Sequence, residues 1–349
     1  MSGESLTELC ALSFEELKQF VTGLGESTFR TSQIAEWVKK GADIEEMTNL
    51  SKALREKLAA VAVTNSVRIN ECLTSKLDGT EKYLYQLRDG NLIEGVRMRY
   101  HYGDTLCVST QVGCRMGCKF CASTLDGCVR SLSAGEILGQ VLAVNRHILA
   151  QDPAAKGIHN VVMMGSGEPL DNYDESIRFL KLLNAHEGLN ISLRNVSLST
   201  CGLVEKMYRL AEEKLPITLS VSLHAPNDEI RQKLMPVAKA YKIEDIIKAC
   251  KNYIDKTGRR VIFEYALVNG VNCSEACADE LASRLRGMQC HVNVIPLNEV
   301  KERELSGPDR AGVERFINRL ESRHISVTRR REMGDDIQGA CGQLRRSRL

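Results

Sequence analysis

Short strand-like runs alternate with helix-like runs from residue 105 to residue 331, and this alternation constrains the fold more than any other feature. Repeated β-α units predict a parallel sheet covered by helices. About six or seven such units make an α/β protein with a partial or full (β/α) barrel core, here 105–331. The expected strands are 106–109, 160–164, 195–200, 217–223, 260–267, 291–295 and 325–330. The expected helices are 133–149, 174–185, 203–214, 243–256, 274–287 and 309–323.

Residues 1–64 precede this core and are expected to form a small N-terminal helical domain. A Ser-x-x-Glu capping box, Ser13 to Glu16, stands ahead of an apolar pattern at helical spacing. Further helical patterns follow before residue 64.

Residues 65–104 change character and are expected to form a short antiparallel β segment that leads into the core. Asp78-Gly79 and Asp89-Gly90 are hairpin-turn signals on either side of a run rich in strand formers, 82–87. At the other end, residues 332–349 contain several glycines and are expected to form a loop with a tail.

The composition is ordinary for a soluble globular protein except for its 13 cysteines. Their odd number and wide spread argue against a disulfide scaffold and favour metal, cluster or redox use. No apolar run approaches the roughly 20 residues that span a membrane, and no signal peptide pattern opens the chain. We therefore expect a cytoplasmic protein with no membrane partner.

The formal net charge is only +2, so any contact with RNA has to come from local patches. Two arginine runs are candidates for such patches, and the alternative interpretation is a solvated surface. The runs are Arg329, Arg330 and Arg331, and Arg345, Arg346 and Arg348.

Three cysteines follow the first core strand at Cys-x3-Cys-x2-Cys spacing: Cys114, Cys118 and Cys121. Closely spaced thiolates on one loop suit an iron–sulfur cluster, and three ligands on a four-iron cluster leave one iron open to a substrate or cofactor. Structural zinc is an alternative, but it prefers four ligands in paired units. Only Cys128 is near enough to be a fourth ligand. The remaining alternative is a set of ordinary buried cysteines.

This cysteine spacing is the signature of radical S-adenosylmethionine (SAM) enzymes, which the chain resembles at this point. A second motif, 163–169, follows the next expected strand and contains Gly167-Glu168-Pro169. It resembles the turn with which those enzymes hold the amino group of SAM. A carboxylate in a Gly-rich turn suits an ammonium group, although the tripeptide alone is usually just a turn.

Further stretches resemble one family, the bacterial adenine carbon-2 RNA methyltransferases known as RlmN. The matching stretches are Glu94, 106–121, 161–170, 198–202, 222–228, 295–298 and 334–344. The resemblance implies a [4Fe–4S] cluster on the three cysteines and a SAM pocket. That pocket would be lined by Gly167, Glu168, Ser199, Ser222, Leu223, His224 and Asn298. It also implies that the helical domain 1–64 contacts RNA.

The resemblance gives roles to three other residues. Cys341 matches the cysteine that the family methylates with one SAM, and Cys107 matches its partner thiol. A second SAM then provides the radical that activates the methyl group, which joins the adenine ring and tethers the RNA to Cys341. Glu94 matches the proposed acceptor of the ring proton, and Cys107 then attacks the Cys341 sulfur to release the methylated RNA. Without the resemblance, Cys107 would be interpreted as a buried strand cysteine.

The family's substrates are an adenine of 23S rRNA near the peptidyl-transferase centre and the adenosine beside the anticodon in some tRNAs. The resemblance also implies an electron donor, either a reductase or a flavodoxin- or ferredoxin-type protein, and we expect a monomer. One departure from the family pattern is 336–341, where Gln338 and Gly339 replace an aspartate and an alanine.

Three rival interpretations remain open. The first is Cfr-type methylation at carbon 8 of the same rRNA adenine, although in that family the Gly-Glu turn tends to continue with Ala rather than with Pro169. The second is an iron–sulfur electron carrier or redox-sensing RNA binder without methyl transfer. The third is a radical SAM enzyme that acts on a small molecule.

Overall fold

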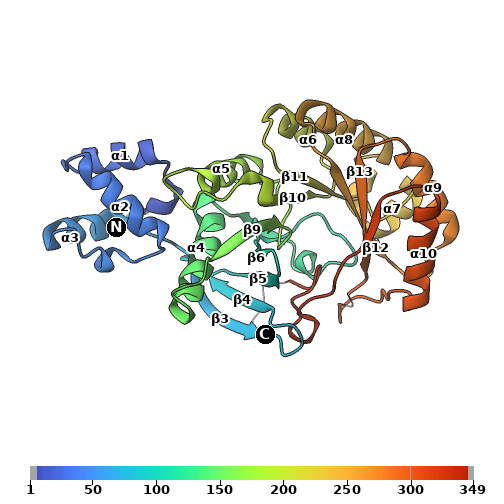
Figure 1. The fold of residues 1–349 in the computed structure, drawn as a ribbon, viewed down its shortest axis with the longest axis horizontal. Helices are drawn as coiled ribbons and strands as arrows, with labels where there is room; N and C mark the ends of the chain where they lie inside the picture. The colour runs from blue at the N-terminus through green and yellow to red at the C-terminus, as the bar shows by residue number, and fades with distance from the viewer. Residues whose placement is uncertain (1–5, 299, 345–349) are drawn as a thin grey trace.

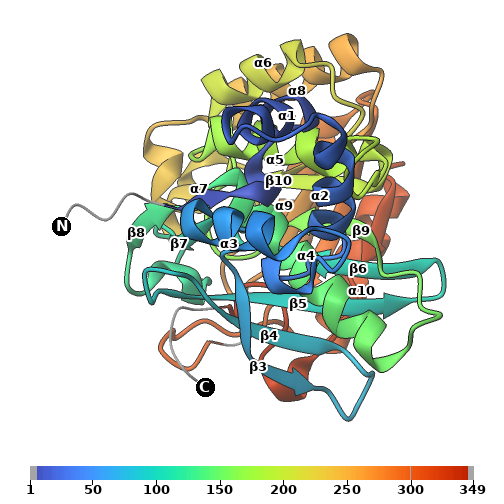
Figure 2. The ribbon, with the colours of Figure 1, turned by 90° about the vertical axis from the view of Figure 1, so that its left-hand side faces the viewer.

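The computed structural model describes residues 6–298 and 300–344. The N-terminal helical domain lies at one end of the molecule, beside α4 and α5 (Figures 1 and 2). Its helices are α1 (Phe14–Gly23), α2 (Phe29–Lys39) and α3 (Lys52–Val61). The expected capping box is present, because Ser13 Oγ accepts from Glu16 N and the Glu16 carboxylate accepts from Ser13 N. This domain has an apolar core of its own, which includes Val21, Ile34 and Leu58.

The core of the molecule is a ten-stranded sheet in which seven consecutive strands are parallel and follow chain order. This confirms the expected α/β fold. These strands are β6 (Gly103–Cys107), β9 (Ile158–Met163), β10 (Val196–Thr200), β11 (Thr218–Ser222), β12 (Val261–Leu267), β13 (Cys290–Pro296) and β14 (Val327–Arg329). The helices are α4 (Ala134–Gln151), α5 (Tyr173–Asn184), α6 (Val204–Glu212), α7 (Asp228–Leu234), α8 (Ile243–Thr257), α9 (Glu275–Leu285) and α10 (Arg310–Ser322).

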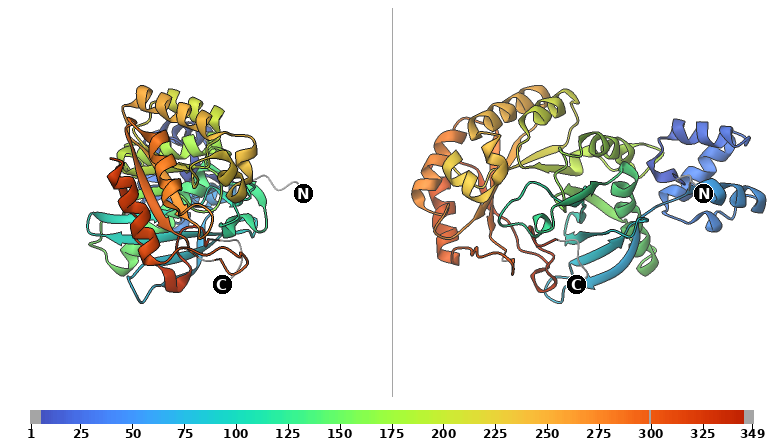
Figure 3. Two further views of the ribbon diagram at one scale, coloured as in Figure 1. Left: turned by 90° about the vertical axis from the view of Figure 1, so that its right-hand side faces the viewer. Right: turned by 180° about the vertical axis from the view of Figure 1, so that it is seen from behind.

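The barrel is partial, because β14 forms one edge of the sheet and β3 the other. The sheet is curved, and its helices lie along the outer side (Figures 1 and 3). The capping pair Ser133 and Glu136 opens α4 as expected. The short helix α7 has no counterpart among the expected elements. None of the described helices is both long and apolar enough to cross a bilayer.

Three antiparallel strands extend the same sheet beyond β6. They are β3 (Arg68–Thr74), β4 (Glu81–Gln86) and β5 (Leu92–Tyr100), and β5 pairs with β6 so that Val96 lies opposite Cys107. The antiparallel segment expected in 65–104 is therefore continuous with the parallel core. This continuity places the side chains of β5 beside those of the first parallel strand.

The loop with the three cysteines stands on a small hairpin that the sequence did not reveal. Its strands are β7 (Gln111–Gly113) and β8 (Cys128–Ser131), and the cysteine loop connects them. Strands of three and four residues are too short to show a clear alternating pattern.

The C-terminal loop contacts the turn between β3 and β4. The backbone N–H of Gly334 donates to Asp78 (3.0 Å), and that of Lys76 donates to Asp336 (2.9 Å). These two bonds fix the start of the segment that ends in Cys341. The arginines of the tail, Arg345, Arg346 and Arg348, lie outside the described residues.

Candidate active site

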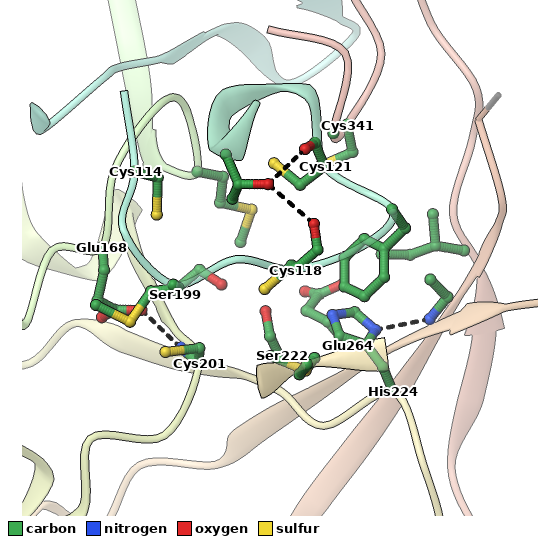
Figure 4. A pocket seen from close by; sticks show the side chains of 18 of the residues that line it. Cys114, Cys118, Cys121, Glu168, Ser199, Cys201, Ser222, His224, Glu264 and Cys341 are labelled. Carbon is green, nitrogen blue, oxygen red and sulfur yellow. Dashed lines mark hydrogen bonds between the residues drawn. The ribbon is translucent and has the colours of Figure 1, made fainter. Parts of the chain in front are cut away.

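An open cavity of about 910 Å³ lies at the carboxyl ends of the parallel strands. This is where (β/α) barrels assemble their active sites. Figure 4 shows side chains that line it. The lining residues come from the cysteine loop, from the ends of β9 to β14 and from the C-terminal loop. Among the residues that the sequence singled out, the lining includes Cys114, Cys118, Cys121, Gly167, Glu168, Ser199, Ser222, His224, Asn298 and Cys341.

The three loop cysteines all line this cavity, and burial raises the pKa of each thiol, that of Cys114 to about 12. The Thr124 hydroxyl lies within hydrogen-bonding distance of the carbonyls of Cys118 (3.0 Å) and Cys121 (2.9 Å), and so supports the loop. In the described part of the chain, no three His, Cys, Asp or Glu side chains gather as one metal ion requires. A [4Fe–4S] cluster is larger and takes its cysteines on separate irons, so these thiols fit a cluster. Cys128 lies on β8 and does not line the cavity.

Gly167 and Glu168 form a tight turn against the hairpin strand β7. Gly167 has a φ of +107°, and a Cβ there would meet the backbone nitrogen of Gln111 at 2.7 Å, so only glycine fits. The Glu168 carboxylate accepts from the backbone N–H groups of Cys201 (2.7 Å) and Leu170 (3.0 Å). Burial raises its pKa. A cationic ligand such as an ammonium group would offset the cost of burying this carboxylate. The turn is therefore suited to the amino group of SAM, as expected from the sequence.

The two predicted serines, Ser199 and Ser222, lie on neighbouring strands and line the cavity, but Leu223 does not. The Leu223 side chain is fully buried in the apolar core, and its backbone N–H donates to the Glu264 carbonyl (3.1 Å). Leu223 therefore contributes its backbone to the strand end rather than its side chain to the cavity wall.

The buried guanidinium of Arg231 holds these strand ends together. It donates to the carbonyls of Cys201 (2.6 Å), Ser222 (3.3 Å), Leu223 (3.2 Å) and Tyr241 (3.2 Å). Its side chain is fully buried on α7, the helix that was not expected from the sequence.

His224 is held in one orientation and in its neutral form. Its backbone has a left-handed φ of 55°, and its Nδ1 accepts from the backbone N–H of Ala266 (2.9 Å). Burial, reinforced by the nearby Arg231, lowers its pKa to about 3. Because Nδ1 is an acceptor, the proton lies on Nε2. The ring also makes an edge contact with Phe120 of the cysteine loop, at 4.7 Å between centroids.

Glu264 and Arg330 also line the cavity, although the sequence placed neither of them there. They come from β12 and from the residue after β14, and their charged groups lie 3.6 Å apart. Asn293 also donates to Glu264 (2.8 Å). Arg330 belongs to a run that was a candidate RNA-contacting patch, with a solvated surface as the alternative. The solvated-surface alternative does not hold for Arg330, because its side chain is only 24% exposed and faces Glu264. A charged residue inside the otherwise apolar run 261–267 was the available signal for Glu264.

Cys341 lines this cavity and also a second one, of about 640 Å³, that contains Cys107. Three bonds hold its loop: Asn298 Nδ2 to the Cys341 carbonyl (3.0 Å), Ala122 N to the Gly342 carbonyl (2.7 Å) and Ser123 Oγ to the Leu344 carbonyl (2.7 Å). Two of these donors directly follow Cys121. The C-terminal loop is thus docked on the cysteine loop.

Cys107 ends β6 and packs against Val96 and Leu344. Burial raises the pKa of its thiol to about 12, with a smaller contribution from Cys341. The structure therefore brings Cys107 and Cys341 to one cavity, although they are far apart in sequence.

Glu94 lies outside both cavities. Its side chain is fully buried on β5 and forms an ion pair with the equally buried Lys82 of β4, at 3.0 Å. Side chains alternate along a strand, so Glu94 shares a face with Val96, which lines the second cavity.

A partial barrel with three loop cysteines and a Gly-Glu turn at its carboxyl end defines a radical SAM enzyme. Residues 108–278 match the radical SAM superfamily, and residues 7–64 match the ribosomal RNA large subunit methyltransferase N-terminal domain. The chain belongs to the RlmN family of radical SAM RNA methyltransferases. Its cofactors are a [4Fe–4S] cluster and SAM.

Relatives match over nearly the full chain. The probable dual-specificity RNA methyltransferase RlmN of Alkaliphilus oremlandii is 52% identical, with 98% of each chain covered. The protein of that name from Clostridioides difficile is 52% identical, with 95% of each chain covered. A crystal structure of a radical SAM methyltransferase from Sphaerobacter thermophilus has a TM-score of 0.93 and 41% identity, covering 98% of this chain and 100% of that one.

Proposed function

We propose that the protein methylates carbon 2 of an adenine in 23S rRNA, near the peptidyl-transferase centre, and of the adenosine beside the anticodon in some tRNAs. One observation carries the proposal: Cys341 lines both the cavity of the three loop cysteines and the cavity of Cys107. A methyl-accepting thiol needs access to the cofactor on one side and to a second thiol on the other. Relatives are named dual-specificity RNA methyltransferases, which supports two RNA substrates.

The reaction needs radical chemistry because carbon 2 of adenine lies between two ring nitrogens and is a poor nucleophile. When bound, the cluster and SAM supply the methyl group and the one-electron chemistry. Cys114, Cys118 and Cys121 would hold the cluster. The Glu168 carboxylate would bind the ammonium group of SAM, beside Ser199, Ser222 and the Nε2–H of His224.

Cys341 accepts the methyl group on its sulfur, and Asn298 helps to hold it at the cavity. With the one-electron chemistry that the cofactors would supply, the methyl group loses one hydrogen atom and its carbon bonds to carbon 2 of the adenine. Loss of the ring proton and of one electron, which returns to the cofactors, then restores the aromatic ring and leaves the RNA linked covalently to Cys341. The Cys107 thiolate attacks the Cys341 sulfur, the bond from sulfur to the methylene carbon breaks, and a disulfide forms between the two cysteines. The electron pair of the broken bond stays on the substrate carbon, which takes up a proton and becomes the methyl group.

Glu94 is the proposed acceptor of the ring proton. Its carboxylate contacts the Lys82 ammonium and shares a strand face with Val96 at the second cavity. To reach a bound adenine, the carboxylate has to turn from Lys82 toward that cavity.

The decisive experiment is anaerobic reconstitution with iron, sulfide, SAM and reductant, followed by mass spectrometry of digested rRNA and tRNA. The expected product is 2-methyladenosine, absent with Cys341→Ala. Methylation at carbon 8 only would place the protein with the Cfr-type enzymes. Absence of both SAM cleavage and methylation would leave an electron carrier or redox-sensing RNA binder.

A further inference from the structure

Two tyrosines form a stacked pair at the turn between β5 and β6. The rings of Tyr100 and Tyr102 lie 4.9 Å apart between centroids and are nearly parallel, at 7°. Tyr102 is 59% exposed, although large aromatic side chains are usually buried. An exposed, pre-stacked aromatic pair is a surface that can accept a further flat ring.

Tyr100 continues a row of β5 side chains whose other members line the second cavity. Val96, Met98 and Tyr100 alternate along one face of β5, and the first two line the cavity of Cys107 and Cys341. The Tyr100 hydroxyl contacts the Met98 sulfur at 3.6 Å, so the ring leans toward the cavity. Tyr102 follows in the turn that joins β5 to β6, and its ring stacks on that of Tyr100.

The charges beside the pair favour a nucleic acid. Arg330 and Arg331 both line the second cavity and both act electrostatically on Tyr100. Aromatic faces beside arginines are the usual means of holding unstacked RNA bases. A protein partner would need a larger apolar surface than one exposed ring.

On the basis of the proposed function, we propose that Tyr100 and Tyr102 stack on a base that neighbours the methylated adenine in the bound RNA. Arg331 neutralises the adjoining phosphate. The pair holds the flanking strand while the adenine itself enters the cavity of Cys341. This gives the RNA an anchor at the active site, separate from the N-terminal domain.

The test uses full-length reconstituted protein and an anticodon stem-loop or rRNA fragment with 2-aminopurine at each position flanking the target adenine. Stacking on tyrosine quenches this fluorophore. We expect quenching at one position with the wild type and with Tyr102→Phe, which keeps the ring. Tyr102→Ala loses the quenching, and its KM for RNA rises about tenfold, with a smaller change in kcat. Tyr208→Ala on α6, where the tyrosine is 38% exposed, is the matched control and behaves as wild type.

If Tyr102→Ala shows the same quenching and the same KM as the wild type, the proposal that the tyrosine pair stacks on RNA is refuted, whichever product the enzyme forms. Slower cluster reduction with unchanged RNA binding would also overturn it, because the surface would then contact the electron donor. Loss of quenching together with a product other than 2-methyladenosine would instead refute the proposed function and leave the stacking pair standing.

Discussion

The side-chain amide of Asn298 donates a hydrogen bond to the backbone carbonyl of Cys341, at 3.0 Å. Asn298 follows β13, whereas Cys341 belongs to the C-terminal loop. The bond ties the proposed methyl-accepting residue to the end of the sheet. The bond involves only the backbone of Cys341, so its sulfur can still face both cavities.

Asn298→Ala is expected to slow the methylation of Cys341 about fivefold, because one hydrogen bond is worth about 1 kcal/mol. The rate is measured by the mass of the Cys341 peptide after incubation with SAM. Asn184→Ala removes a comparable amide-to-carbonyl bond, to Ile191 at 3.1 Å, far from the cavity. Equal rates in both variants would show that the Asn298 contact does not orient Cys341.

Glu168→Gln is expected to raise the Kd for SAM by about 10- to 100-fold, because a charge-assisted bond is worth about 1.5–3 kcal/mol. The amide keeps the shape of the side chain but has no charge for an ammonium group. Isothermal titration gives the Kd. Glu175→Gln is the control, since Glu175 also accepts from a backbone N–H, that of Ala134 at 2.6 Å. Unchanged SAM affinity in Glu168→Gln would remove its proposed role.

Release of the RNA adduct is expected to speed up as pH rises. The pKa of Cys107 is raised to about 12 by burial, so its thiolate fraction grows about tenfold per pH unit between pH 7 and 9. The decay of a preformed adduct, followed on denaturing gels, should show this slope. Cys107→Ala should accumulate adduct at every pH. A rate that is flat with pH would mean that another step limits release.

The sequence predicted those parts of the site that depend on local spacing. The cysteine loop and the Gly167-Glu168 turn follow buried strands, and the carboxyl ends of parallel strands converge on one side. Cys107 and Cys341 came from the family resemblance, since nothing local to either residue marks a partner far away in the chain.

The missed features depend on tertiary partners. Arg330 stands in a run of three arginines that is typical of a surface, yet its partner Glu264 lies two strands away in the sheet. Arg231 was missed for the same reason, because it donates hydrogen bonds to backbone carbonyls at the ends of β10 and β11. A sequence pattern shows that a side chain is charged, but not which distant groups surround it.

Arg231→Met is expected to destabilise the fold by about 3–5 kcal/mol, because it leaves several buried carbonyls without a donor. The midpoint of urea unfolding measures the change. Arg209→Met removes an exposed arginine paired with Asp174 and should cost about 0–1 kcal/mol. If both variants unfold at the same midpoint, the Arg231 bonds contribute nothing to stability.

The buried pair of Lys82 and Glu94 allows a structural role to be separated from a catalytic one. Glu94→Gln alone should destabilise the protein by about 3–5 kcal/mol, because a buried ammonium loses its carboxylate. The double variant Lys82→Met with Glu94→Leu removes both charges and should recover most of that stability. If Glu94 accepts the ring proton, the recovered protein still forms methylated Cys341 but accumulates the RNA adduct. Normal yields of methylated RNA from a stable double variant would show that Glu94 has a structural role and does not accept the ring proton.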